Sequence, residues 1–226
     1  IVKQTEDLAG LPDASIQTAK EKADAKGYTG QWLFTIDKPT LIPFLQYSEN
    51  RQLREKMYKA YMNRGNNNDE LDNKNIFSRI VVLRVEKANL LGYKTYSDFV
   101  LQKKMAKTPE NVYSFLNDIW NPTVLKAKSE VEDMQKIIDA EGGKFSLEPW
   151  DWWYYAEKVK KEKFALDEEM LRPYFQLENV INGVFAVATK LWGLQFIERN
   201  DIEVYNPEMK VFEVKEADGK HIGILY

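Results

Sequence analysis

The chain has 226 residues, of which 44% are apolar and 30% are charged, a composition typical of a globular protein. Its formal net charge of −3 gives no indication of a nucleic-acid or anionic-membrane partner. The absence of cysteine excludes disulfides, thiolate zinc sites and cysteine nucleophiles within the chain, and it leaves the compartment open between cytoplasm and bacterial periplasm. The single histidine, His221, excludes a metal site with two histidine ligands in one copy. No apolar run approaches the roughly 20 residues of a membrane-spanning helix.

Helical periodicity, with capping residues and glycine stops, predicts most of the chain up to residue 193. Between these helices, Gln31–Ile36 alternates in polarity and predicts a short strand. The start at Thr108 is well marked, because Pro109 suits the first helical position and Glu110 favours the positive end of the helix dipole. The helices expected outside the aromatic stretch are Leu11–Lys26, Thr40–Tyr47, Ser48 or Asn50 to about Asn63, Lys74–Leu91, Thr95–Lys104, Thr108 to about Ala140, and Leu177–Trp192.

An aromatic stretch, Glu148–Lys158 (EPWDWWYYAEK), is predicted to be the packing centre. Pro149 is expected in the first turn of its helix. One buried face has helical spacing and consists of Trp152, Tyr155, Ala156 and Val159. Trp150, Trp153 and Tyr154 fall on another side. The alternative interpretation of the same aromatics is a platform on which a substrate stacks.

After residue 193 the pattern changes to short β-prone pieces. The expected strands are Leu194–Glu198, Ile202–Tyr205, Val211–Val214 and His221–Tyr226, the last two joined by a hairpin turn at Ala217-Asp218-Gly219. The predicted fold is therefore mainly α with a small C-terminal β hairpin or sheet. The predicted division is a helical region at 1–193, with its short strand near 31–36, and a β-rich segment at 194–226.

Five blocks of sequence carry a resemblance to a known family. They are RQLREKMYKAYMNRG (Arg51–Gly65), VVLRVEKANLLGYKTYSDFVLQKKMAKTPENVYSFL (Val81–Leu116), LRPYFQLENVINGVF (Leu171–Phe185), KLWGLQF (Lys190–Phe196) and KVFEVKEADGKHIGILY (Lys210–Tyr226). In this order and spacing they resemble the thimet-oligopeptidase family of zinc metallopeptidases, and within it most of all the bacterial peptidyl-dipeptidases (dipeptidyl carboxypeptidases) and oligopeptidase A. The resemblance covers nearly the whole chain.

This resemblance implies a mostly helical enzyme with a deep channel that admits short peptides. In the family, zinc is held by two histidines of an HExxH helix and a further glutamate. That motif is absent here, and the chain stops inside a predicted strand, at Ile222–Tyr226. We therefore expect a segment of a longer parent protein, forming part of its channel wall, with the β-rich segment leading into the missing catalytic part. The zinc belongs to the parent; this chain alone is expected to contain no catalytic, cofactor-binding or metal-ligating residue and to be inactive. Whether the parent releases dipeptides or cuts internally stays open.

Two other functions fit parts of the sequence. One is a stand-alone helical scaffold that binds peptides or a partner through an aromatic groove. The other is a metal-independent hydrolase with paired carboxylates, Glu148/Asp151 or Glu168/Glu169. Each pair lies at a helix start, where acids are expected as dipole partners, so the pattern favours a structural role.

Several isolated features have structural interpretations that are favoured over functional ones. His221 follows the hairpin turn and is expected to be exposed or half-buried, rather than a zinc ligand shared between two copies. The polar loop Asn66–Asn73 lacks the sixth-position glycine of a calcium loop and has Phe77 at the twelfth position, so a solvated loop is expected. The arginines that are interpreted as helix-face salt bridges, rather than anchors for a peptide carboxylate, are Arg51, Arg54, Arg64 and Arg84.

The interpretation as a segment has two structural consequences. An unpaired strand edge near Ile222–Tyr226 is expected to cause self-association, because exposed edges pair with other chains. Apolar surface that packs against the rest of the parent is expected to be exposed in this chain.

Overall fold

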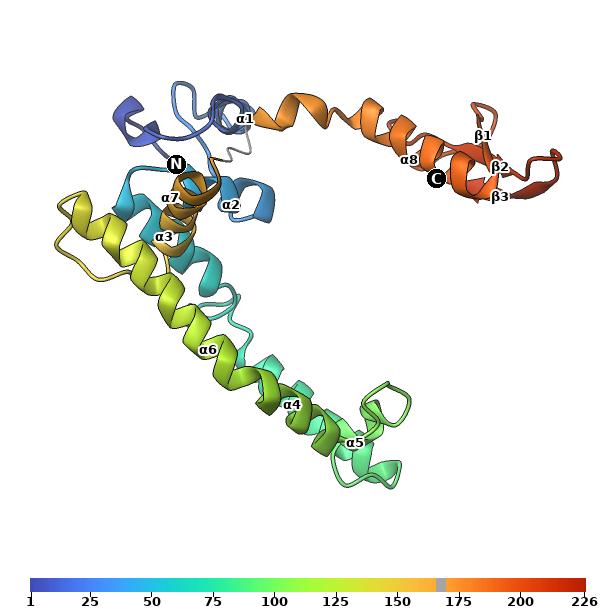
Figure 1. The fold of residues 1–226 in the computed structure, drawn as a ribbon, viewed down its shortest axis with the longest axis horizontal. Coiled ribbons are helices and arrows are strands. Elements are labelled where there is room, and N and C mark those ends of the chain that lie inside the picture. Colours follow the sequence, from blue (N-terminus) through green and yellow to red (C-terminus); the bar gives the residue numbers. More distant parts are fainter. Residues whose placement is uncertain (166–169) are drawn as a thin grey trace. The chain divides into compact units, whose positions relative to one another are not determined.

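The computed structural model describes residues 1–165 and 170–226, and the chain forms two compact units, Ile1–Ala165 (unit 1) and Leu166–Tyr226 (unit 2) (Figure 1). Unit 1 contains α1 (Asp13–Asp24), α2 (Lys38–Tyr47), α3 (Arg51–Met62), α4 (Lys74–Leu90), α5 (Tyr96–Leu101), α6 (Pro109–Ala140) and α7 (Trp152–Phe164). Unit 2 contains α8 (Leu177–Trp192), β1 (Gln195–Glu198), β2 (Phe212–Lys215) and β3 (His221–Leu225). Short 3₁₀ turns lie at Thr5–Leu8 and Arg172–Tyr174. The predicted class, mainly α with a small C-terminal sheet, is confirmed.

Local capping chemistry explains where α2, α3, α5 and α6 begin. The side chains of Asn50 and Thr108 accept the backbone N–H groups of Leu53 and Asn111, as expected for caps of α3 and α6. Helix α2 differs from the prediction: Asp37 caps it and accepts the N–H of Thr40, so the helix begins before the predicted cap.

Two predicted elements are wrong in part, and one is wrong altogether. Pro149 lies before α7, which begins only at Trp152. The segment Gln31–Ile36 forms a single bridge, between Trp32 and Val2, because no neighbouring strand continues the pairing. The segment Ile202–Tyr205 is not a strand, and the three-stranded sheet has the order β1-β2-β3 without it. Alternating polarity predicts an extended chain, whereas a strand also needs a partner.

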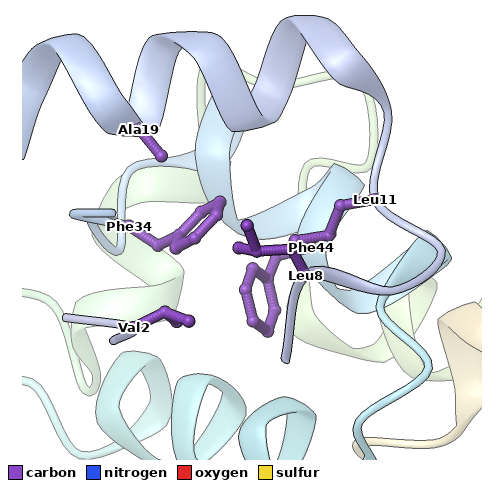
Figure 2. Close-up of a cluster of buried hydrophobic side chains, with 6 residues drawn as sticks. All are labelled: Val2, Leu8, Leu11, Ala19, Phe34 and Phe44. Carbon is purple, nitrogen blue, oxygen red and sulfur yellow. The ribbon is translucent and has the colours of Figure 1, made fainter. Parts of the chain in front are cut away.

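The first core cluster of unit 1 joins the N-terminal segment, α1 and α2. Its buried members are Val2, Leu8, Leu11, Ala19, Phe34 and Phe44. Figure 2 shows these side chains gathered beneath α1, with the rings of Phe34 and Phe44 next to each other. Their centroids are 4.8 Å apart in an edge-to-face arrangement, which aromatic pairs prefer.

A second cluster joins α6 to α7. Met134 and Ile138 of α6 pack against Tyr155 of α7, and all three are buried. Around them lie further apolar side chains, among them Trp152, Ala156 and Val159. The predicted buried face of the aromatic stretch is therefore confirmed as a packing centre.

Unit 2 is held together by three phenylalanines. Phe185 of α8 stacks on Phe196 of β1 at 4.2 Å between ring centroids and meets Phe212 of β2 edge-on at 4.8 Å. The strands pair antiparallel, and the register shifts between Val214 and Lys215. Among the side chains of residues 170, 171 and 173–226, whose burial is described, only Val211 is buried, so this unit has very little core of its own.

Helix α8 presents an apolar stripe on its exposed side. The residues of this stripe are Leu177, Val180, Val184, Val187 and Leu191, each at least 41% exposed. Their spacing alternates between three and four residues, which is the spacing of a helix seam that packs against another helix. Similar exposure marks α4, where Ile76, Phe77, Ile80 and Leu83 are accessible. The apolar surface expected from the sequence is present.

The Asp37 cap should make stability depend on pH. A hydrogen bond from Thr35, supported by Thr40 and Lys22, lowers the pKa of Asp37 from 3.8 to about 2. Its stabilising contribution is therefore fully present above pH 3.8 and is lost as the pH falls through about 2. Asp37→Ala is expected to lower the free energy of unfolding by about 1 kcal/mol at neutral pH.

The measurement is urea denaturation of both proteins between neutral pH and the acid limit of folding. Asp13→Ala is the matched control, because Asp13 also lies at a helix start but Pro12 is the residue at the cap. A difference between wild type and Asp37→Ala that stays constant below pH 3.8, or that Asp13→Ala reproduces, would contradict the assignment.

Candidate functional site

A buried arginine–aspartate cluster links α3 to the start of α7. The Asp151 carboxylate is fully buried, and Arg54 is 1% exposed. Arg51 donates from Nη2 to Asp151 Oδ2 at 2.8 Å and from Nε to Oδ1 at 3.1 Å. Arg54 donates from Nη2 to Asp151 Oδ1 at 2.9 Å and from Nη1 to the Ser48 carbonyl at 2.8 Å. Both carboxylate oxygens are thus held by guanidinium groups, the strongest class of neutralising partner.

This cluster corrects two interpretations of the sequence. Arg51 and Arg54 do form salt bridges, but these join two elements instead of lying along one helix face. Asp151 is not an acid–base partner of Glu148, because its carboxylate is occupied by two cations. The hydrogen bond to Asp151 also raises the pKa of Arg51 above its usual value. The other predicted pair, Glu168/Glu169, lies outside the described residues.

The aromatic side chains near the cluster contact its cations. The Arg51 guanidinium lies 4.1 Å from the Phe145 ring centroid, and that of Arg54 lies 4.1 Å from Tyr154. Such contacts stabilise a cation that has lost part of its hydration. Tyr154 therefore has a structural role here.

An apolar cavity of about 660 Å³ lies between α2, α3 and the start of α7. Its walls include Leu41, Leu45, Tyr58, Tyr61, Trp152 and Trp153. Trp153 is 40% exposed, so one aromatic wall is open to solvent. The cavity has the size and lining of ordinary small-molecule sites.

The remaining predicted residues have local partners. Arg64 lies over the Tyr61 ring and donates to the Tyr61 carbonyl, and Arg84 lies over Tyr96. His221 is exposed, as predicted, and its Nδ1 lies 3.0 Å from Glu213 Oε1.

The polar loop Asn66–Asn73 surrounds an ammonium group. Lys74 Nζ lies 3.1 Å from Asn66 Oδ1, 2.6 Å from Asn68 Oδ1 and 2.7 Å from Asp72 Oδ2. The hydrogen bond from Lys74 lowers the pKa of Asp72 from 3.8 to about 2. The oxygens of this loop therefore bind a cation that belongs to the chain itself.

The described ranges, 1–165 and 170–226, contain no group of three or more His, Cys, Asp or Glu side chains arranged to hold a metal ion. In the same ranges, no helix combines the length and the apolar character that crossing a membrane requires.

The comparison with protein families identifies the class of the chain. Residues 44–226 match the model of peptidase family M3, and the chain belongs to that family. Members of the family are in general zinc-dependent peptidases. The donor set of the described residues does not fit such a zinc ion, because the chain offers one histidine and no metal-binding cluster.

The relatives support the same family. The chain is 39% identical to dipeptidyl carboxypeptidase of Escherichia coli over 227 residues, which is all of this chain and 33% of the relative. It is 35% identical to oligopeptidase A of Salmonella typhimurium, over all of this chain and 34% of that protein. It is 31% identical to saccharolysin of Saccharomyces cerevisiae, over 94% of this chain and 31% of the relative. The chain thus spans about a third of the curated relatives it matches, and the resemblance seen in the sequence is confirmed.

Proposed function

We propose that these residues form a non-catalytic part of a zinc peptidase that hydrolyses oligopeptides, and that they build part of the wall of its substrate channel. The family match over residues 44–226 carries this proposal. The names dipeptidyl carboxypeptidase and oligopeptidase A indicate short peptides as the substrate class.

The exposed apolar faces support a role as a wall. The stripe on α8 and the accessible residues of α4 are surfaces that helices normally bury. Unit 2, with one buried residue among those described, lacks the core that independent stability requires. Further polypeptide of the parent would cover both surfaces. In this proposal, residues 1–193 form the helical wall, and residues 194–226 form the β segment that leads to the catalytic part.

The chemistry belongs to residues outside this segment. The zinc ligands of the family are two histidines and a glutamate, whereas this chain has only His221, which lies beside Glu213 on the sheet. The chain alone is therefore proposed to bind no catalytic zinc and to cleave no peptide.

The test compares this chain with the longer protein that contains it. The longer protein is expected to hydrolyse short peptides, to lose that activity with a chelator and to regain it with zinc. The 226-residue chain is expected to show neither stoichiometric zinc by elemental analysis nor peptide cleavage by chromatography. If the purified chain contained one zinc and cleaved peptides in a chelator-sensitive way, the proposal would be wrong.

The proposal also includes self-association through β3. This strand lies at one edge of the sheet, and Ile222, Leu225 and neighbouring side chains are exposed there. An edge without charges or proline is open to pairing with another strand. Sedimentation is expected to show dimers of the chain at high concentration, and Ile222→Lys is expected to abolish them.

Ile197→Lys provides the matched control for this prediction. Ile197 is similarly exposed but lies on β1, at the opposite edge of the sheet. A monomeric wild type, or equal effects of both lysine variants, would argue against pairing through β3.

A further inference from the structure

The cavity between α2, α3 and α7 has apolar walls and two charged groups. Lys38, the first residue of α2, and Glu148, just before α7, line the same cavity as Trp152 and Trp153. Both charged residues are exposed. Within residues 1–165 and 170–226, neither side chain forms a hydrogen bond or an ion pair. The charge of Glu148 acts on Arg51, but the guanidinium of Arg51 is bonded to Asp151.

The lining of the cavity indicates which kind of ligand would bind there. Four aromatic rings, from Tyr58, Tyr61, Trp152 and Trp153, line the cavity and favour a bulky apolar group. One free carboxylate and one free ammonium favour a ligand that carries both charges and is neutral overall. A purely apolar ligand would gain nothing from these two hydrated groups, and a ligand with one charge would pair with only one of them.

We propose that the cavity binds a small zwitterion with a bulky apolar side chain, namely an aromatic or branched aliphatic amino acid or dipeptide. Its ammonium group pairs with Glu148, its carboxylate pairs with Lys38, and its side chain lies among the aromatic rings. The proposal depends on unit 1 alone and does not rest on the peptidase function.

The cavity explains the part of the aromatic stretch that packing does not use. Trp152 belongs to the second core cluster, whereas Trp153 is 40% exposed and faces the cavity. The two neighbouring tryptophans thus have different roles: Trp152 lines the cavity and also packs in the second core cluster, whereas Trp153 lines the cavity without belonging to that cluster.

Calorimetry of the 226-residue chain tests the proposal with L-phenylalanine and L-phenylalanyl-L-phenylalanine as probes. Saturable binding of at least one probe is expected. N-acetyl-L-phenylalanine lacks the ammonium group, and L-phenylalaninamide lacks the carboxylate, so each should bind about tenfold more weakly than phenylalanine. Phenylalanine has no peptide bond, so its binding is independent of whether the parent is a peptidase.

Variants assign each charge to its residue. Glu148→Gln should remove the preference for phenylalanine over its N-acetyl analogue, and Lys38→Gln should remove the preference over the amide. Trp153→Ala should abolish binding of both probes. The matched controls are Lys20→Gln, an exposed lysine of α1, and Trp192→Ala, which is 69% exposed in unit 2. Circular dichroism confirms that each variant is folded.

The proposal is overturned if neither probe binds saturably, if both analogues bind as well as phenylalanine, or if the controls weaken binding as much as the cavity variants. It is also overturned if Trp153→Ala changes the sedimentation of the chain without affecting a probe, because the cavity would then be a contact between two copies.

Discussion

Asp151→Asn is expected to lower the free energy of unfolding of unit 1 by about 3–5 kcal/mol. The carboxylate is fully buried and is shared by two guanidinium groups, one of them on the buried Arg54. Asparagine keeps the size of the side chain but removes its charge. The Arg54 cation would then stay buried without a counter-charge, and desolvation of that cation accounts for most of the loss.

Urea denaturation followed by tryptophan fluorescence measures this change, because five of the six tryptophans lie in unit 1. The control is Asp133→Asn, the same substitution in an exposed ion pair with Lys163 and Lys136, where a small change is expected. Equal unfolding midpoints for the two variants would contradict this prediction. They would show that the buried ion pairs of Asp151 contribute no more to the free energy of unfolding than the ion pairs of Asp133.

Phe44→Ala is expected to destabilise unit 1 by about 3–5 kcal/mol. Phe44 is 1% exposed and packs edge-on against Phe34 in the first core cluster. Truncation removes buried apolar surface and leaves a cavity, since a core made of the N-terminal segment, α1 and α2 cannot collapse completely around the missing ring.

Phe77→Ala is the matched control, because Phe77 of α4 is 65% exposed and its truncation removes little buried surface. The same denaturation experiment compares both variants with the wild type. A loss below 1 kcal/mol for Phe44→Ala, or a similar loss for Phe77→Ala, would contradict the assigned core.

Structural features that depend on a few neighbouring residues could be predicted from the sequence. The caps at Asn50 and Thr108 and the bounds of α8 depend on neighbouring residues, and the structure has them where they were expected. Pro149 misled the prediction because it lies in a turn that the Asp151 N–H closes on the Glu148 carbonyl, and α7 begins only after this turn, at Trp152.

Interactions between distant residues could not be predicted in the same way. Asp151 and Arg54 are 97 residues apart, and no spacing rule relates them. Acidic residues are common at helix starts, so the sequence analysis interpreted Asp151 as a partner of the helix dipole. Its contact with α3 is visible only in the folded structure. The sequence suggested a stacking platform on the aromatic stretch but not the cavity itself, since the cavity walls come from four helices, α2, α3, α6 and α7, and from the segment before α7.

The scarcity of buried side chains in unit 2 affects the order in which the molecule loses structure. Val211 is the one buried residue among the unit 2 side chains that the structure describes, so the hairpin strands depend chiefly on backbone hydrogen bonds and on the stacked rings of Phe185 and Phe196. Regions with little apolar cover open at low free-energy cost. Local fluctuations will therefore melt the terminal sheet long before they disturb the helical unit, and any surface that docks onto it will supply much of its rigidity.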